Sequence, residues 1–210
     1  WRSSQGLIDQ FSIELSNDEL PALFLLADGI GGHEKGEVAS LTAIDTIFHH
    51  FAPTQKDFNI MPAVMEAHTV LTLNASSSYR PMGTTIVGLV LNSDGATVFN
   101  VGDSRALKLD DTSIIQISHD DVGDQTPQNV ITQSLGGGSK LPKLNPRNLS
   151  FCQGDTFVLV SDGISSWLEN DDIHQIVKLN DADSSFHLCS EAVRAGSGDD
   201  VSAVVIKCPN

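Results

Sequence analysis

Cysteine, aromatic residues and long apolar runs are all scarce in this chain. Its 210 residues include three Cys, one Tyr and two Trp. No apolar run is long enough to span a bilayer, and no basic segment precedes a short apolar segment in the manner of a signal peptide. We therefore expect no membrane insertion and no secretory signal within these residues.

The three cysteines are far apart and show no Cys-x-x-Cys spacing: Cys152, Cys189 and Cys208. An odd number without paired spacing argues against a disulfide framework and against a zinc–thiolate site. We expect all three to be small buried apolar side chains in a reducing compartment, which predicts a cytoplasmic protein.

Basic residues are also few, since 12 Lys and Arg stand against 27 Asp and Glu, for a net charge of −15. Such a charge repels the phosphates of nucleic acids and of anionic lipids, so we expect neither as a partner. The acidity indicates either a solubilising surface or carboxylates that bind divalent cations, and composition alone does not choose between them.

Strand and helix patterns share the chain without an internal repeat. Apolar or β-branched strand patterns occupy 11–15, 22–27, 84–91, 97–101, 106–109, 114–117, 156–160 and 201–207. Helical spacing predicts two long helices, the first through Leu41, Ile44, Phe48 and Phe51, the second through Met61, Val64, Met65 and Leu71. Two shorter helices are predicted at 171–179 and 184–195, and the strands from 84 to 117 predict an antiparallel meander. This order favours one α+β sandwich domain over residues 1–210.

Three aspartates stand beside apolar strands, where a turn begins: Asp28, Asp162 and Asp199. Because strand ends can converge, their carboxylates could form an oxygen cage for Mg²⁺ or Mn²⁺. An Asp-Gly pair also marks an ordinary tight turn, and for any single pair that interpretation is favoured.

The residues around these aspartates form five blocks in a recognisable order. The blocks are Asp28-Gly29-Ile30-Gly31-Gly32-His33, Met82-Gly83-Thr84-Thr85, Val101-Gly102-Asp103-Ser104-Arg105, Val160-Ser161-Asp162-Gly163 and Asp199-Asp200-Val201-Ser202. Together they resemble the motifs of the bacterial metal-dependent protein phosphatases (PPM family), the protein phosphatase 2C-like serine/threonine class. The resemblance implies a four-layer α-β-β-α sandwich, in which two antiparallel sheets are flanked by helices.

The resemblance also implies a metal pair, either Mn²⁺ or Mg²⁺, that activates a shared water for attack on phosphorus. Asp28 would bridge both metals, the Gly29 carbonyl would bind one of them, and Asp162 and Asp199 would hold the other. Asp9 resembles the family aspartate that precedes the first strand and would be a further ligand. Asp28 and Asp162 are accordingly the predicted catalytic residues.

Two residues are predicted to contact the substrate phosphate. Arg2 resembles the arginine of the family's Arg-x-x-Asn-Glu/Gln-Asp start, although the spacing to Asp9 is two residues longer, and a solvated terminal arginine is the alternative. His33 would lie on the substrate side of the site, or would pack the loop before the first helix.

A third, weaker metal site is implied at Asp120, because Ile117-Ser118-His119-Asp120-Asp121 stands where the family has Thr-x-Asp-His. A solvated acidic turn is the alternative. The stretch around 118–136 is shorter than in typical members, which predicts a shortened flap beside the site. Asp103 and Arg105 are expected to tie a strand turn together, and the remaining histidines, including His68, are expected on the surface or on helix faces.

These features predict an enzyme, a protein serine/threonine phosphatase, acting on phosphorylated proteins that include a Ser/Thr kinase or its substrates. A pseudophosphatase that keeps the sandwich as a regulatory binding module is the alternative. A small-molecule phosphatase would share the same metal chemistry.

Overall fold

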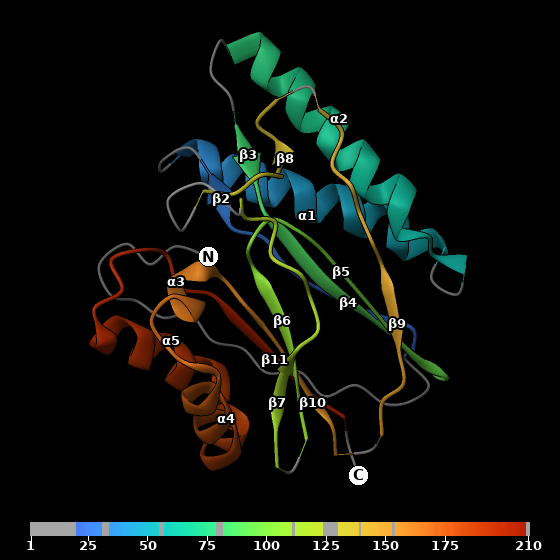
Figure 1. Cartoon of the computed structure of the whole chain (residues 1–210). Helices are drawn as coiled ribbons and strands as arrows, with labels where there is room; N and C mark the ends of the chain where they lie inside the picture. Colours follow the sequence, from blue (N-terminus) through green and yellow to red (C-terminus); the bar gives the residue numbers. More distant parts are fainter. Residues whose placement is uncertain are drawn as a thin grey trace.

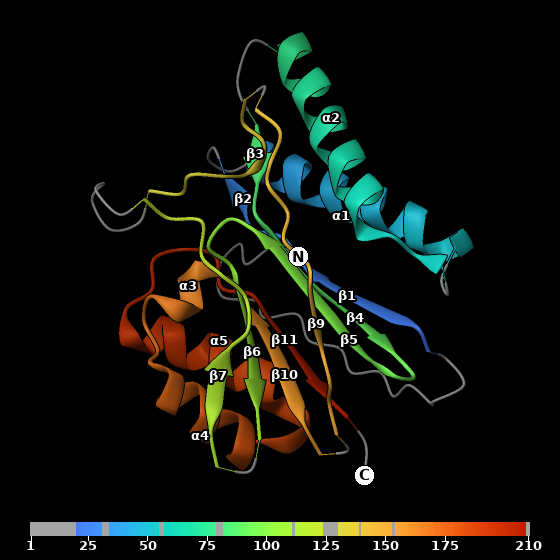
Figure 2. The same cartoon turned by 45° about the vertical axis from the view of Figure 1, so that its right-hand side comes forward.

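Two antiparallel sheets form the centre of the computed structural model, which describes residues 20–30, 34–54, 57–78, 82–110, 112–123, 130–138, 140–152 and 154–208. The first sheet has the order β1 (Ala22–Leu26), β4 (Ile86–Asn92), β5 (Gly95–Val101) and β9 (Arg147–Leu149). The second has the order β11 (Ala203–Lys207), β10 (Thr156–Val160), β6 (Arg105–Leu109) and β7 (Ile114–Gln116). Figures 1 and 2 show the two groups of strands side by side.

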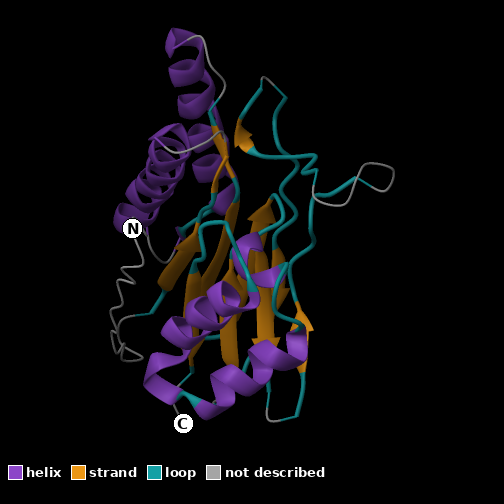
Figure 3. Cartoon of the chain, turned by 90° about the vertical axis from the view of Figure 1, so that its left-hand side faces the viewer, coloured by secondary structure: helices purple, strands orange, loops and turns teal. Residues whose placement is uncertain are grey.

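Helices cover the outer face of each sheet, so the predicted four-layer α+β sandwich is confirmed. Two long helices, α1 (Glu34–Thr54) and α2 (Ile60–Ser78), pack together beside the first sheet. The second sheet is covered by α4 (Asn170–Leu179) and α5 (Ser184–Ala195), joined by the short turn η3 (Asp181–Asp183). Figure 3 shows the strands between these helical layers.

A third, smaller sheet lies beside α1 and α2 and was not predicted. It contains β2 (Gly29–Ile30), β3 (Gly83–Thr84) and β8 (Leu135–Gly136) in that order. Each of its strands has only two residues, which is too short for an alternating pattern to be visible in the sequence.

The core consists of three apolar layers that follow from the two-residue period of the strands. In β4, Val87, Leu89 and Leu91 face the layer between the two sheets. Ile86 and Val90 face the layer under α1 and α2. The strand is therefore buried on both faces, as an inner strand of a layered fold requires.

The strands between 84 and 117 do not form one continuous meander, so that prediction is wrong. β4 pairs with β5 and β6 pairs with β7, but β5 and β6 belong to different sheets. The chain crosses between the sheets at Gly102, whose φ of +104° is a conformation that favours glycine. Alternation along a strand does not specify which sheet it joins, because both sheets bury one face in the same central layer.

The buried face of α1 also differs from the prediction. Leu41 and Phe48 are 61% and 54% exposed. Phe51 faces the core as predicted, but the other core-facing residues are Ala39, Ala43 and Ile47. The small alanines on this face let α1 approach α2 closely, and small residues add little to a hydrophobic pattern.

His68 and Cys152 are the other residues placed differently from expectation. His68 on α2 is only 3% exposed, and its Nδ1 accepts a hydrogen bond from the Gly136 N–H at 3.2 Å. Burial lowers the pKa of His68. Cys189 and Cys208 are buried as predicted, but Cys152 is exposed; all three are free thiols.

Among the described residues, no helix has the length and apolar character needed to cross a membrane.

Candidate active site

Asp28 lies in the short connection between β1 and β2, and the Thr84-Thr85 pair holds its main chain. Its N–H donates to Thr85 Oγ1 at 3.0 Å. Its carbonyl accepts from the Thr85 N–H at 2.8 Å and from Thr84 Oγ1 at 2.8 Å. Ser104 Oγ lies 2.7 Å from Thr85 Oγ1, and all three hydroxyl side chains are buried. The second and third sequence blocks therefore hold the backbone of Asp28 in place.

The residue after Asp28 lies directly against helix α1. A Cβ atom on Gly29 would lie 2.2 Å from the Gly36 carbonyl oxygen, and one on Gly36 would lie 2.7 Å from the Gly29 carbonyl oxygen. Neither glycine can carry a side chain without moving one backbone away from the other. This close approach explains the two glycines and fixes the position of the Gly29 carbonyl, the predicted metal ligand.

The second part of the site joins the end of β10 to the loop before β11. Asp162 opens the short helix α3 (Asp162–Ser165). Ser161 binds the loop through its side chain, because Ser161 Oγ donates to the Asp200 carbonyl at 3.2 Å and accepts from the Ser202 N–H at 3.1 Å. A Cβ atom on Gly163 would lie 2.3 Å from the Asp200 carbonyl oxygen. These contacts place Asp162 and Asp199 on neighbouring segments.

The carboxylates of the two parts meet. Burial is the largest cause that raises the pKa of Asp28 to about 8, and the contacting Asp162 carboxylate is the next, with smaller contributions from Asp199 and Asp103. Two carboxylates in contact, such as Asp28 and Asp162, need a shared proton or a cation between them. Asp28 and Asp162 are therefore in contact, and the charge of Asp199 acts on Asp28 from the neighbouring segment. The roles of these three aspartates as metal ligands stay predictions.

Asp103 is a fourth carboxylate of this cluster, and sequence reasoning missed it. Burial raises its pKa to about 6, and the neighbouring Asp162 is the next cause. Arg105 forms its ion pair with Asp120, and its positive charge also acts to lower the pKa of Asp103. The expectation that Asp103 and Arg105 tie one turn together stays a prediction. The available signal was the position of Asp103 just beyond the end of an apolar strand, which it shares with Asp28 and Asp162.

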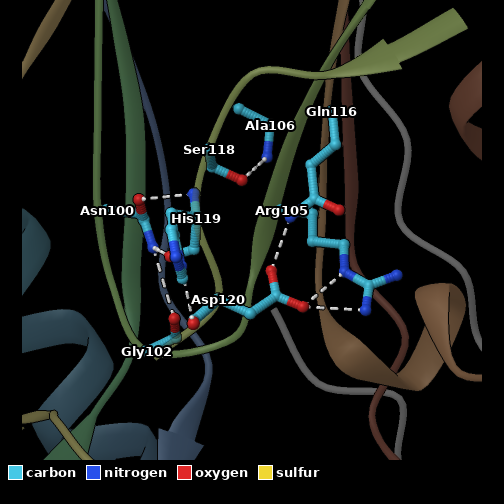
Figure 4. Close-up of polar contacts among 8 residues, drawn as sticks. All are labelled: Asn100, Gly102, Arg105, Ala106, Gln116, Ser118, His119 and Asp120. Carbon is cyan, nitrogen blue, oxygen red and sulfur yellow. Dashed lines mark hydrogen bonds and ion pairs between the residues drawn. The ribbon is translucent and has the colours of Figure 1, made fainter. Parts of the chain in front are cut away.

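Asp120 lies in an ion pair, shown in Figure 4. Its Oδ2 accepts from Arg105 Nε at 2.9 Å and lies 2.8 Å from a terminal guanidinium nitrogen. Its Oδ1 accepts from Gln116 Nε2 at 2.6 Å. Both carboxylate oxygens therefore have partners within the protein. The third metal site at Asp120 stays a prediction, and a cation there would have to share these oxygens with Arg105 and Gln116.

Three predicted site residues, Arg2, Asp9 and His33, lie outside the described residues, as does the strand predicted at 11–15. Their roles stay predictions.

The donor chemistry of the cluster fits Mn²⁺ or Mg²⁺, because the groups are carboxylates that repel one another when ionised. Within the described part of the chain, no group of three or more His, Cys, Asp or Glu side chains is arranged to hold a metal ion. The predicted ligand set adds the Gly29 carbonyl and Asp9 to the contacting pair Asp28 and Asp162. In that prediction the described residues would supply only part of the cation site.

Comparison with known proteins identifies the group to which these motifs belong. A family model described as protein phosphatase 2C matches residues 3–197. The chain belongs to the protein phosphatase 2C family. The predicted family and the enzyme class of the family, protein serine/threonine phosphatase, are confirmed.

Two bacterial members of this family illustrate the degree of similarity. Protein phosphatase PhpP of Streptococcus pneumoniae is 27% identical over 210 aligned residues, which cover 88% of this chain and 85% of PhpP. The serine/threonine protein phosphatase PstP of Mycobacterium tuberculosis is 29% identical over 227 aligned residues, which cover 97% of this chain and 43% of PstP. The chain thus spans less than half of the length of PstP.

Solved structures of the family share the fold. PppA, a regulatory component of T6SS in Pseudomonas aeruginosa, superimposes with a TM-score of 0.80 at 25% identity, covering 88% of this chain and 85% of PppA. The catalytic domain of PstP in complex with two manganese ions has a TM-score of 0.74 at 26% identity, with 96% of each chain covered.

The Thr85→Val substitution tests the hydrogen bonds around Asp28. Valine keeps the shape but leaves the Asp28 N–H and the Ser104 hydroxyl without this partner. We expect a loss of about 1 to 3 kcal/mol in the free energy of unfolding, together with a smaller Mn²⁺-induced rise in melting temperature. Thr69→Val on α2 is the control, because Thr69 Oγ1 donates only to the Met65 carbonyl on an exposed face. Equal effects of the two substitutions in urea unfolding would contradict the assigned role of Thr85.

Proposed function

We propose that this chain is a metal-dependent protein phosphatase that hydrolyses phosphoserine and phosphothreonine on proteins. The contact between Asp28 and Asp162, which adds to burial in raising the pKa of Asp28 to about 8, is the observation that carries the proposal. Two ionised carboxylates in this position are stable only beside a cation. The manganese ions in the related PstP structure support the same conclusion.

Two Mn²⁺ or Mg²⁺ ions would be held by Asp28, the Gly29 carbonyl, Asp162 and Asp199, together with Asp9. Bound cations supply the Lewis acidity that activates water and the positive charge that faces a phosphoryl group. The chain itself contributes rigidity: Thr84 and Thr85 hold Asp28, and Ser161 holds the Asp200 segment. This rigidity keeps the carboxylates in place when the site is empty.

Arg2 and His33 are proposed to bind the substrate phosphate, and Asp120 to contribute to a third, weaker cation site. The substrates are phosphorylated proteins, including a Ser/Thr kinase or the proteins that it modifies. A cytoplasmic location is proposed, because the three cysteines are free thiols and two of them are buried.

Hydrolysis of a phosphothreonine peptide tests the proposal. With millimolar Mn²⁺ the protein is expected to release phosphate, and excess EDTA is expected to abolish the release, because the proposed nucleophile is a water that the cations would activate. A protein that binds Mn²⁺ without turnover would indicate the pseudophosphatase. A protein that cleaves p-nitrophenyl phosphate but neither phosphothreonine nor phosphoserine peptides would indicate a small-molecule phosphatase.

A further inference from the structure

Asp121 makes more hydrogen bonds than a surface turn requires. On one side it pairs with Gly102: the Asp121 N–H donates to the Gly102 carbonyl, and the Gly102 N–H donates to Asp121 Oδ2, both at 2.9 Å. The main chain and the side chain of Asp121 therefore bind both the carbonyl and the N–H of Gly102, the residue at which the chain changes sheets.

On its other side Asp121 holds a segment that lies later in the sequence. Its Oδ1 accepts from Gln133 Nε2 at 2.6 Å. Its carbonyl accepts from the Thr132 N–H at 2.7 Å and from Thr132 Oγ1 at 3.0 Å. Gln133 continues the network, since its Oε1 accepts from the Lys143 N–H at 2.7 Å. Asp121 thus joins its own segment to the Gly102 turn and to the segment that contains Thr132 and Gln133.

The first of these segments leads directly into the carboxylate cluster. Gly102, with its φ of +104°, immediately precedes Asp103, and Asp103 lies close enough to Asp162 for the two charges to interact. The orientation of the Gly102 peptide therefore controls where the Asp103 carboxylate lies. Asp121 holds both polar groups of Gly102, and Asn100 Nδ2 donates to the same carbonyl at 3.2 Å, so Asp121 contributes to fixing that orientation and, among the described residues, alone holds the N–H side.

The neighbouring Asp120 has different partners and does not share this role. It binds Arg105 and Gln116 (Figure 4), whereas both carboxylate oxygens of Asp121 accept hydrogen bonds from other groups. Asp121 stands in the place of the final His of the Thr-x-Asp-His pattern. Its interactions are those of a structural clamp, because each carboxylate oxygen accepts a hydrogen bond from another segment of the protein.

We propose that Asp121 is a positioning residue: it holds Asp103 in the cation-binding cluster by clamping the Gly102 turn to the segment at 131–133. The role rests on the proposed function, because it takes the cluster to be the metal site of the phosphatase. Asp121 does not contact substrate or metal. Its effect on the reaction passes through Asp103.

The test is Mn²⁺ affinity, measured by titration calorimetry on the full chain well below the melting temperature of each variant. Asp121→Ala removes both side-chain hydrogen bonds, and we expect Mn²⁺ to bind about tenfold more weakly. Asp121→Asn retains one acceptor and is expected to recover part of this loss. Asp45→Ala, which removes the same charge from an exposed position on α1, is expected to bind Mn²⁺ like the wild type.

A purely structural Asp121 predicts a different result, namely a lower melting temperature with unchanged Mn²⁺ affinity, which would overturn the proposal. If Asp121→Ala does not fold, Gln133→Leu removes one arm of the network and is expected to weaken Mn²⁺ binding less than tenfold but measurably; no change would again overturn it.

Mn²⁺ binding by the variants and phosphopeptide hydrolysis by the wild type test the role of Asp121 and the proposed function separately. A wild type that binds Mn²⁺ but hydrolyses no phosphopeptide contradicts the hydrolysis, while the Asp121 comparison still stands. A wild type that binds no Mn²⁺ overturns both.

Discussion

The Asp28→Asn protein is expected to lose Mn²⁺-dependent hydrolysis while its metal-free form becomes more stable than the metal-free wild type. Loss of a bridging carboxylate removes about 4 kcal/mol of transition-state stabilisation, or about a thousandfold in kcat. Stability changes in the opposite sense, because the neutral amide introduced by the substitution avoids the cost of burying a charge and does not repel Asp162. Activity assays and thermal unfolding on the same preparations measure both effects.

The pH dependence of metal-free stability gives the sign of this effect. A carboxyl group whose pKa rises on folding, here from 3.8 to about 8, prefers to be protonated in the folded state. The free energy of unfolding of the metal-free wild type therefore falls as pH increases through this interval. Asp28→Asn removes that decline, so the two proteins should differ most near pH 8 and least near pH 4.

Asp94→Asn provides the control, since Asp94 is exposed in the turn between β4 and β5. It should leave kcat and the pH profile of stability as in the wild type. An Asp28→Asn protein that retains more than about a tenth of the wild-type kcat would exclude Asp28 as a bridging ligand. A metal-free Asp28→Asn protein less stable than the wild type at pH 8 would contradict the charge repulsion.

Gly163→Ala is expected to have the second largest effect, because it separates Asp162 from Asp199. The new Cβ would lie 2.3 Å from the Asp200 carbonyl oxygen and 3.1 Å from the carbonyl carbon, so backbone must move. We expect a loss of about 1 to 3 kcal/mol in stability. A displacement of the Asp199 segment by about 1 Å would reduce kcat/KM by about a hundredfold.

Gly198→Ala is the matched control within the same loop. No atom lies within 4 Å of a Cβ at Gly198, so the substitution should leave stability, Mn²⁺ affinity and kcat/KM unchanged. Crystal structures of both variants would measure the displacement directly. If Gly163→Ala loses stability but keeps its Mn²⁺ affinity, the approach of α3 to Asp200 serves packing and not the metal site.

Much of the fold follows from local patterns. The helix α5 and the strand β10 begin and end at the predicted residues, because each has a clear period and is bounded by turn residues. The small third sheet could not be predicted, since its two-residue strands have no period. The buried face of α1 was predicted only at Phe51, because alanine contributes to close helix packing but hardly to a hydrophobic pattern.

The candidate site also has residues that the sequence indicates and interactions that it does not. The sequence blocks indicate Asp28, Asp162 and Asp199 because motif order depends only on neighbouring residues. The hydrogen bond between Asp28 and Thr85 joins residues 57 positions apart, and the one between Ser161 and Ser202 joins residues 41 positions apart. Local propensity does not specify such partners.

The sequence by itself determined the family, the central strands and the three aspartates of the proposed cation site, because these depend on residue type and short-range spacing. Only the tertiary structure decided that the chain changes sheets at Gly102, that Asp103 joins the carboxylate cluster and that Arg105 binds Asp120. It also decided that Asp121 clamps the Gly102 turn. The physical reason is that the position of a charge relative to other charges depends on backbone segments that are distant in sequence, and only folding brings these segments together.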